Sequence, residues 1–260
     1  PNMLIFDPFL SYPTRDFVPW PPFFDLLTAT ISLPFSNPIF LICSINLIFV
    51  IAVFLMIYFV QRKKGLTNFV LSAIIIIFSC SIIKIGMFGS IDHHIVEVFV
   101  VTAFYVIYLF KPFKPKIRSI VITLVVAISF FNWPGAPLYY VPVFILTFWE
   151  AFNGKCDEKT FLDLGIAFTV TGILIFIYFS ITEHNVHPYS FKYLSEFQRD
   201  ICLALGLLFF AVFVKVKKNF SVIVFVILSF IIIFVFHNVI FEIFRGFNYL
   251  EKTNESKLME

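Results

Sequence analysis

The chain has 260 residues, of which 60% are hydrophobic and only 13% charged, and its mean hydropathy is +0.96. Soluble domains are about 45–50% apolar and about 25% charged, so these totals exclude an ordinary soluble domain and indicate an integral membrane protein. The net charge of +3 is too small to indicate a nucleic-acid partner, and the four cysteines form no CxxC pair that would support a zinc site or a disulfide framework.

The first 37 residues are not expected to cross a membrane. They are dense in proline, which breaks helices, and the prolines alternate with aromatic residues. Asp25 is a suitable N-cap for a short helix from Leu26 to Leu33 that lies at the membrane surface. Trp20 and its aromatic neighbours suit the interfacial belt of a membrane protein.

The rest of the chain is dominated by long apolar runs. A membrane span needs about 17–25 mostly apolar residues, and about eight runs approach or meet that length. They cover residues 38–60, 67–86, 95–110, 117–132, 136–152, 161–180, 201–216 and 220–242. We therefore expect an all-α polytopic membrane protein with about eight transmembrane helices.

This pattern divides the chain into three parts. Residues 1–37 form an extracytoplasmic loop with a short interfacial helix, residues 38–244 form the transmembrane bundle, and residues 245–260 start another extracytoplasmic loop. Charge sets the orientation, because loops rich in Lys and Arg stay in the cytoplasm. One set of alternate loops holds most of these residues, for example Arg62-Lys63-Lys64 and the cations between Lys111 and Arg118. The opposite loops are acidic and therefore face outward.

A cluster of ionisable residues stands at the outer edge of one span. The segment Asp92-His93-His94-x-x-Glu97 lies between two apolar runs, and charge at a membrane rim is costly enough to indicate function. Glu97 is one helical turn from both histidines. Asp92 and His94 offer oxygen and nitrogen ligands that suit Mg²⁺ or Mn²⁺. The alternative is an Asp-capped helix with its histidines among lipid headgroups.

Two further outer-loop acids have the same two interpretations. Glu183 follows Ser180-Ile181-Thr182, and Glu260 ends the sequence. Either is a metal ligand or a solvated loop residue. His237 is expected to be a packed or hydrogen-bonded side chain, and residues 132–137 to form a rigid outer turn.

Four stretches of the chain resemble the catalytic subunit of archaeal oligosaccharyltransferases, in order and in spacing. Residues 7–13 and 18–25 look like the proline-rich first outer loop of that family. Asp92-His93-His94-x-x-Glu97 looks like its second acidic motif, and Trp133-Pro134-Gly135-Ala136-Pro137 like the turn that follows. The likeness covers residues 6–155 and continues beyond them mainly as a shared topology.

The resemblance implies a membrane glycosyltransferase of N-glycosylation. Such an enzyme moves a glycan from a dolichyl or polyprenyl (pyro)phosphate to the Asn of an Asn-x-Ser/Thr acceptor polypeptide, with Mn²⁺ or Mg²⁺ as cofactor. The partners implied are the lipid-linked oligosaccharide, the acceptor and membrane lipid, at a multi-pass site in the cell membrane whose active face is extracytoplasmic. Asp92 and His94 carry over as metal ligands, Asp92 also as a catalytic residue, whereas the family's motif assigns neither His93 nor Glu97.

The family places a further metal-binding and catalytic Glu on its fifth outer loop. Ser180-Ile181-Thr182-Glu183 matches the letters of that motif. Six spans should separate the loop from the second acidic motif, however, and only four of the expected spans precede Glu183. Six precede Glu260, so we expect Glu260 in this role and keep Glu183 as the alternative.

Two parts of the family pattern are missing from the sequence. One is the first acidic motif, upstream of the proline-rich loop, and the other is the soluble C-terminal domain with its Trp-Trp-Asp-Tyr-Gly motif. We therefore expect a fragment that is inactive alone and needs the missing parts of the same enzyme. Two other readings stay open: a related lipid-linked-sugar glycosyltransferase with another acceptor, and a transporter or scaffold without catalysis. The scarcity of mid-span charge argues against a transporter.

Overall fold

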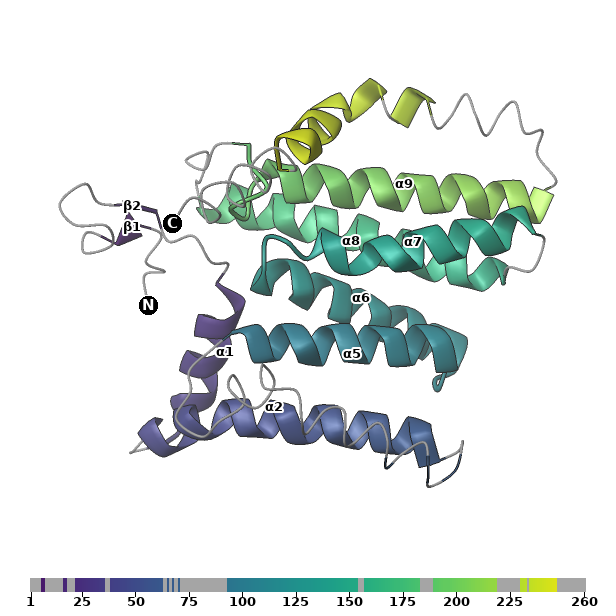
Figure 1. Ribbon diagram of the computed structural model, residues 1–260. Coiled ribbons are helices and arrows are strands. Elements are labelled where there is room, and N and C mark those ends of the chain that lie inside the picture. The colour runs from purple at the N-terminus through teal and green to yellow at the C-terminus, as the bar shows by residue number, and fades with distance from the viewer. Residues whose placement is uncertain are drawn as a thin grey trace, which may run out of the picture. The chain divides into compact units, whose positions relative to one another are not determined.

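The computed structural model of the chain is almost entirely helical, which confirms the expected all-α membrane fold (Figure 1). It describes residues 6–7, 16–17, 22–35, 38–62, 65, 67, 70, 93–153, 157–182, 189–218, 230–232 and 234–246. The chain divides into two compact units, Pro1–Trp133 and Pro134–Glu260. Each unit is built from long apolar helices, because the sequence alternates apolar runs with short polar or proline-containing breaks.

The first unit contains four described helices and a small hairpin. The helices are α1 (Phe23–Ser32), α2 (Pro38–Gln61), α5 (His94–Phe110) and α6 (Pro115–Asn132). Strands β1 (Phe6–Asp7) and β2 (Asp16–Phe17) pair antiparallel, with Phe6 opposite Phe17. Helix α5 packs against both α2 and α6 (Figure 1). The sequence did not predict the hairpin.

The core of the first unit lies along α5. Buried residues here include Val96, Val100 and Phe104, which have the i, i+4 and i+8 spacing of one helix face. The adjacent Ile95 is buried as well. The rings of Phe49 on α2 and Phe99 on α5 meet edge to face, with 5.1 Å between their centroids. Such pairs contribute about 0.5–1.5 kcal/mol beyond their buried area, so they help to hold α5 against its neighbour.

The surface helix near the N-terminus differs from the expected one at its start. Helix α1 begins at Phe23, its N-cap is Pro22, and no side chain caps it. The prediction that Asp25 is the N-cap was therefore wrong, because Asp25 lies inside the first turn. Proline is tolerated at a helix start, where its missing N–H would be unpaired in any case, and so the helix extends further upstream than an acidic cap would allow.

The second unit contains α7 (Pro137–Phe152), α8 (Glu158–Thr182) and α9 (Glu196–Lys218). Helices α8 and α9 pack along each other, and glycine residues lie at their contact. A Cβ added at Gly206 would lie 2.9 Å from the backbone nitrogen of Thr169 and 3.2 Å from the carbonyl oxygen of Gly165. Small residues let membrane helices approach this closely, and here they bring two backbones into contact.

An aromatic cluster fills the space between the three helices of the second unit. Its centre is Phe209, which is buried on α9. Its ring lies 5.8–6.3 Å, centroid to centroid, from those of Phe144, Phe148, Phe161 and Phe168. The abundance of Phe in the sequence therefore serves packing at this place.

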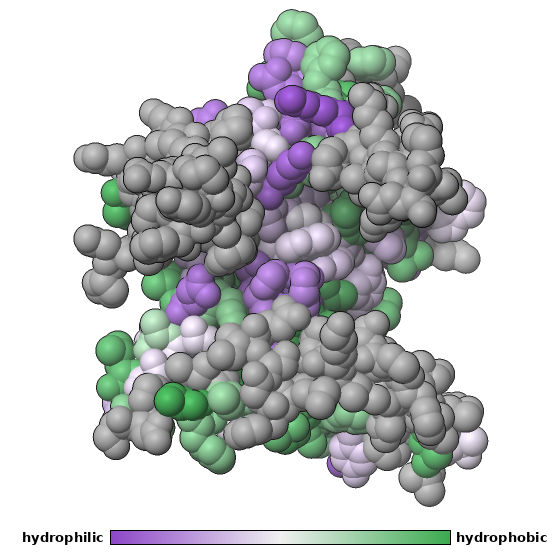
Figure 2. All heavy atoms as spheres, turned by 60° about the vertical axis from the view of Figure 1, so that its left-hand side comes forward, coloured by the Kyte–Doolittle hydropathy of each residue, from purple (hydrophilic) through white to green (hydrophobic). Residues whose placement is uncertain are grey.

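Four of the described helices are long and apolar enough to cross a membrane. These segments are Ile39–Gln61, Pro115–Asn132, Glu158–Ile181 and Glu196–Val214, and α5 is a shorter apolar helix. Six of the expected spans therefore coincide with described helices, the sixteen-residue α7 included. The expected span 67–86 lies mostly outside the described residues, and so do residues 220–229 of the expected span 220–242, whereas its residues 230–232 and 234–242 are described and mainly helical. In Figure 2 hydrophilic residues (purple) gather in the middle and upper part of the face shown, and hydrophobic residues (green) lie mostly toward its edges.

Helix α5 ends at a residue with an unusual backbone. Lys111, its C-cap, has φ 46° and ψ 51°, in the left-handed region, and its backbone N–H donates to the carbonyl of Ile107. Lysine in this conformation is uncommon, since glycine or asparagine normally occupies it. The left-handed residue turns the chain, and Pro115 then starts α6 at the position where helices favour proline.

Candidate metal centre at the start of helix α5

The expected cluster lies at the first turn of α5. The helix starts at His94 with His93 as its N-cap, and no side chain caps it. The N-cap position thus belongs to His93, and Asp92, which the alternative reading made the cap, lies outside the described residues. The carbonyl of His93 accepts the first helical hydrogen bonds, from the N–H groups of Val96 (3.0 Å) and Glu97 (3.4 Å).

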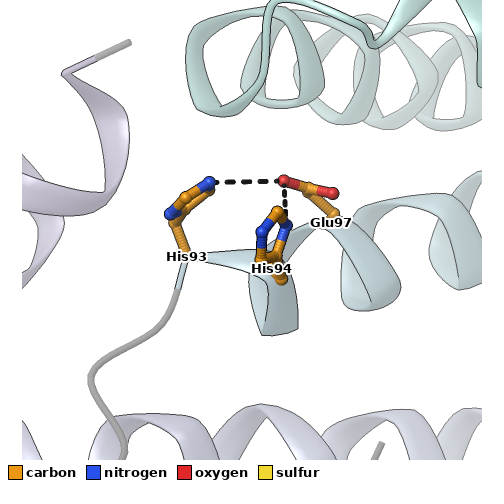
Figure 3. A group of neighbouring side chains, drawn as sticks. All are labelled: His93, His94 and Glu97. Carbon is orange, nitrogen blue, oxygen red and sulfur yellow. Dashed lines mark hydrogen bonds and ion pairs between the residues drawn. The ribbon is translucent and has the colours of Figure 1, made fainter. Parts of the chain in front are cut away.

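The histidines and the glutamate meet, as their spacing predicts. The Nδ1 atom of His94 lies 2.9 Å from the Oε1 atom of Glu97, at hydrogen-bond distance. The Nε2 atom of His93 lies 3.7 Å from the same oxygen. Figure 3 shows both imidazoles turned toward the carboxylate, and their ring centroids are 4.3 Å apart. Three residues therefore share one small region at the start of the helix.

Burial distinguishes the members of this group. The side chain of Glu97 is 9% exposed, that of His93 is 30% exposed and that of His94 is 49% exposed. A carboxylate this deep is costly unless it is paired, and the His94 imidazole supplies a partner. The first turn of a helix also favours a negative charge, because backbone N–H groups point toward it. The carboxylate is thus stabilised by its own helix and by the adjacent ring.

A residue from α6 fixes the backbone of the cluster. Asn132, which is 1% exposed, donates from its Nδ2 atom to the carbonyl of His93 across 3.2 Å. Asn132 is the last residue of α6, directly before the Trp133 turn, so this bond joins the end of α6 to the start of α5. No local pattern in the sequence indicates this contact, since the residues are 39 positions apart.

The donor set fits a divalent cation. One ligand atom from each of His93, His94 and Glu97 lies within 4.8 Å of the others. Imidazole nitrogen and carboxylate oxygen together suit first-row divalent ions such as Mn²⁺ and Zn²⁺ better than Mg²⁺, which prefers oxygen alone. The residues could therefore hold such an ion, provided that further ligands come from elsewhere in the chain.

The other expected metal ligands cannot be compared with this group. Asp92, Glu183 and Glu260 lie outside the part of the chain that the structure describes. His237 is a structural side chain, as expected: its Nδ1 atom is 3.1 Å from the carbonyl of Phe234, and its ring meets that of Phe241 edge to face. Of the expected metal ligands, His94 is the one that lies among the described residues.

A second polar network orders the start of α9 in the second unit. Gln198 is fully buried. Its Oε1 atom accepts from the backbone N–H of Ser195 at 2.7 Å, and its Nε2 atom donates to the carbonyl of Pro134 at 3.2 Å. The hydroxyl of Ser195 donates to the carbonyl of Ser190 at 2.7 Å. These bonds satisfy backbone groups that would otherwise be buried and unpaired, and so fix the loop before α9.

Charges next to this network act on a nearby phenol. Arg199 forms ion pairs with Glu196 (3.0 Å) and Asp200 (2.8 Å). Tyr189 lies in the loop before α9, and burial, reinforced by the negative charge of Asp200, raises the pKa of its phenol well above the usual range. The phenol is therefore protonated at any physiological pH.

Fold and site together define an all-α polytopic membrane protein with a histidine–glutamate cluster at the start of one helix. No family model and no curated protein sequence matches the chain. Its fold is shared with archaeal oligosaccharyltransferase AglB from Archaeoglobus fulgidus. In its complex with an inhibitory peptide and a dolichol-phosphate, AglB matches 95% of this chain with a TM-score of 0.72 at 16% identity.

Two other structures of the Archaeoglobus fulgidus oligosaccharyltransferase show the same likeness. One is tethered to an acceptor peptide containing the NVT sequon and matches 83% of this chain, with a TM-score of 0.69 at 18% identity. The other, a complex with Zn and sulfate, matches 90%, with a TM-score of 0.66 at 16% identity. The chain spans 28–33% of the length of these proteins. The fold expected from the sequence resemblance is confirmed, and at this identity the likeness concerns the fold.

Proposed function

We propose that the chain is part of a metal-dependent oligosaccharyltransferase of N-glycosylation. In this role the protein moves a glycan from a polyprenyl or dolichyl (pyro)phosphate to the Asn of an Asn-x-Ser/Thr sequon. The observation that carries the proposal is the AglB fold over 95% of the chain. The cluster of His93, His94 and Glu97 adds a donor set at one end of a helix within that fold.

The same comparison supports the choice of substrates. The AglB structures contain a dolichol-phosphate in one case and a peptide with an NVT sequon in another. We carry both ligand classes over to this chain, with a lipid-linked oligosaccharide as donor and a sequon-containing polypeptide as acceptor. The exposed apolar side chains along α2, such as Ile48, Ile51 and Leu55, would contact membrane lipid.

The proposed metal ligands are Asp92, His94 and an outer-loop glutamate, Glu260 or alternatively Glu183. A bound Mn²⁺ or Mg²⁺ would supply positive charge against the phosphate of the leaving group. His94 would hold the ion through an imidazole nitrogen, and Asp92 through its carboxylate. As catalytic residues, Asp92 and Glu260, or Glu183, would orient the weakly nucleophilic acceptor amide, since an ionised carboxylate accepts hydrogen bonds from an NH₂ group.

The active face is proposed to be extracytoplasmic, in a multi-pass protein of the cell membrane. Helix α5 supports this orientation, because the cluster lies at its start and Lys111, Lys114 and Lys116 follow its end. Cations near the end of a span stay in the cytoplasm. The opposite end of α5, with His93 and His94, would then face outward, where a flipped lipid-linked donor is available.

A transfer assay tests the function. The full-length protein, reconstituted in nanodiscs, is given a lipid-linked oligosaccharide and a fluorescent peptide with an Asn-x-Thr sequon. We expect glycosylated peptide with Mn²⁺, none with EDTA, and none when the peptide Asn is replaced by Gln. His94→Ala and Asp92→Ala should abolish transfer, and His237→Ala should not.

Two results would count against this function. Wild-type transfer by His94→Ala would remove the cluster from the active site. Sugar transfer from the same donor to a hydroxyl acceptor, with none to the peptide, would instead establish the related glycosyltransferase with another acceptor.

A further inference from the structure

Glu97 contacts the expected metal ligand without being one of the expected ligands. It lies in the first turn of α5, three residues after His94, and its Oε1 atom is 2.9 Å from the Nδ1 atom of that ring. The His93 ring is 3.7 Å from the same oxygen, beyond the usual 2.7–3.2 Å of an N–H···O hydrogen bond. The carboxylate therefore acts mainly on His94 (Figure 3).

The hydrogen bond fixes the tautomer of His94. An ionised carboxylate only accepts hydrogen bonds, so the contact requires a proton on Nδ1 of His94. In a neutral imidazole with that proton, the lone pair is on Nε2, the nitrogen on the other side of the ring. The lone pair on Nε2 is the one a cation can use. Metal-binding histidines commonly donate their other ring nitrogen to a carboxylate in this way.

Burial separates two roles that Glu97 could have. Its side chain is 9% exposed, whereas that of His94 is 49% exposed. The group that reaches open space is thus the imidazole, and the carboxylate lies behind it. A direct ligand would need to present its oxygen to the ion, whereas a positioning residue only needs to reach Nδ1, and Glu97 already does.

We propose that Glu97 is a positioning residue that orients the His94 imidazole so that its Nε2 atom binds a divalent cation. The proposal deepens the function proposed above and rests on it for the identity of the ligand. It assigns a role to a residue that the sequence resemblance leaves unassigned. Loss of such a partner typically lowers metal affinity about 10–100-fold.

Two substitutions of similar volume separate positioning from direct ligation. Glu97→Gln keeps an oxygen that accepts the Nδ1 proton but lacks a carboxylate for the ion. Glu97→Met removes the acceptor and suits a buried position, where apolar replacement of a paired charge is often tolerated. Glu158→Ala, which removes an exposed acid from the first turn of α8, is the matched control.

The measurement is Mn²⁺ binding to the full-length protein in nanodiscs, without donor or acceptor. Isothermal titration gives the dissociation constant, and pulsed electron paramagnetic resonance reports nitrogen coupled to the bound Mn²⁺. We expect Glu97→Met to raise the dissociation constant about 10–100-fold and to weaken the nitrogen coupling. The dissociation constant of Glu97→Gln should stay within a few-fold of the wild-type value, and that of Glu158→Ala should equal the wild-type value.

A double substitution checks the route of the effect. If Glu97 acts through His94, then Glu97→Met combined with His94→Ala should bind Mn²⁺ as weakly as His94→Ala alone. Additive losses of Mn²⁺ affinity would mean that Glu97 acts on the ion independently of His94. Equal losses in Glu97→Gln and Glu97→Met would make Glu97 a direct ligand, and either result would overturn the proposal. Wild-type Mn²⁺ binding in Glu97→Met would overturn it as well, as would the absence of bound Mn²⁺ in the wild-type protein.

The transfer assay separates this proposal from the function on which it rests. Glycan transfer together with unchanged Mn²⁺ affinity in Glu97→Met would reject positioning and keep the enzyme. Weakened Mn²⁺ binding in Glu97→Met, in a protein that transfers no glycan, would support positioning and reject the enzyme.

Discussion

The side-chain amide of Asn132 donates to the backbone carbonyl of His93 across 3.2 Å, and so joins the end of α6 to the start of α5. The bond is part-buried, with the Asn132 side chain 1% exposed. Replacement by Ala should therefore lower the free energy of unfolding by about 1 kcal/mol, the usual contribution of such a bond. Thermal unfolding of Asn132→Ala measures this loss.

The control for Asn132→Ala is a second asparagine at a helix end. Asn153 donates to the carbonyl of Trp149 at 2.9 Å, but this bond is exposed to solvent. Water replaces an exposed partner, so the free energy of unfolding of Asn153→Ala should be close to that of wild type. Equal losses in the two variants would show that burial of the Asn132 bond has no effect.

Mn²⁺ should stabilise the folded protein through His94. A ligand that binds only the folded state adds about 2.7 kcal/mol at 100 times its dissociation constant. We expect Mn²⁺ to raise the melting temperature of the wild type, and EDTA to reverse the shift. His94→Ala should lose the shift, whereas His237→Ala should keep it, because the described contacts of His237 are the backbone carbonyl of Phe234 and the ring of Phe241. An unchanged shift in His94→Ala would contradict the metal centre.

The α8–α9 contact should not tolerate a methyl group at Gly206. The added Cβ would meet the Thr169 side chain and lie 2.9 Å from its backbone nitrogen, so the helices must move apart. Gly206→Ala should cost about 1–3 kcal/mol, as overpacking usually does. At Gly246 the nearest atom, on the ring of Phe191, is 3.6 Å away, so Gly246→Ala should be neutral or stabilising. Thermal unfolding in detergent compares the two, and a Gly206→Ala variant as stable as wild type would contradict the close packing.

Tyr189 should make the protein sensitive to alkaline pH. Its raised pKa means that the folded chain holds the phenol proton more tightly than the unfolded chain does. Its contribution to stability is therefore complete below the ordinary Tyr pKa of about 10 and is lost as the pH rises through the higher folded value. Tyr189→Phe has no such proton, so its melting temperature should fall less steeply than that of wild type above about pH 10. If the melting temperatures of wild type and Tyr189→Phe fell in parallel above about pH 10, the raised pKa of Tyr189 would be contradicted.

The sequence predicted most of the described helices because their cores are uninterrupted apolar runs. It placed the start of α9 too late, at residue 201 instead of Glu196. The cause is a charged first turn: Arg199 and its neighbours look like a loop in the sequence. In the structure Arg199 pairs with Glu196 and Asp200, which reduces the cost of placing these charges on a helix.

Contacts of the candidate site between residues close in the sequence were predictable, and contacts between distant segments were not. The spacing of His94 and Glu97 already places them on adjacent turns of one helix, and the structure shows them 2.9 Å apart. The contact between Asn132 and His93 depends on how α5 packs against α6, which no local pattern encodes. The roles of Asp92, Glu183 and Glu260 stay predictions, since these residues lie outside the described part of the chain.

The left-handed Lys111 at the end of α5 has a consequence for engineering. Glycine at this position would relieve a steric penalty of about 1–2 kcal/mol and should give a more stable protein. The same exchange would delete a cation from the loop that, in the orientation proposed here, marks the cytoplasmic side. Heat resistance and correct insertion therefore favour different residues at one position, and selection for the first alone would weaken the signal for the second.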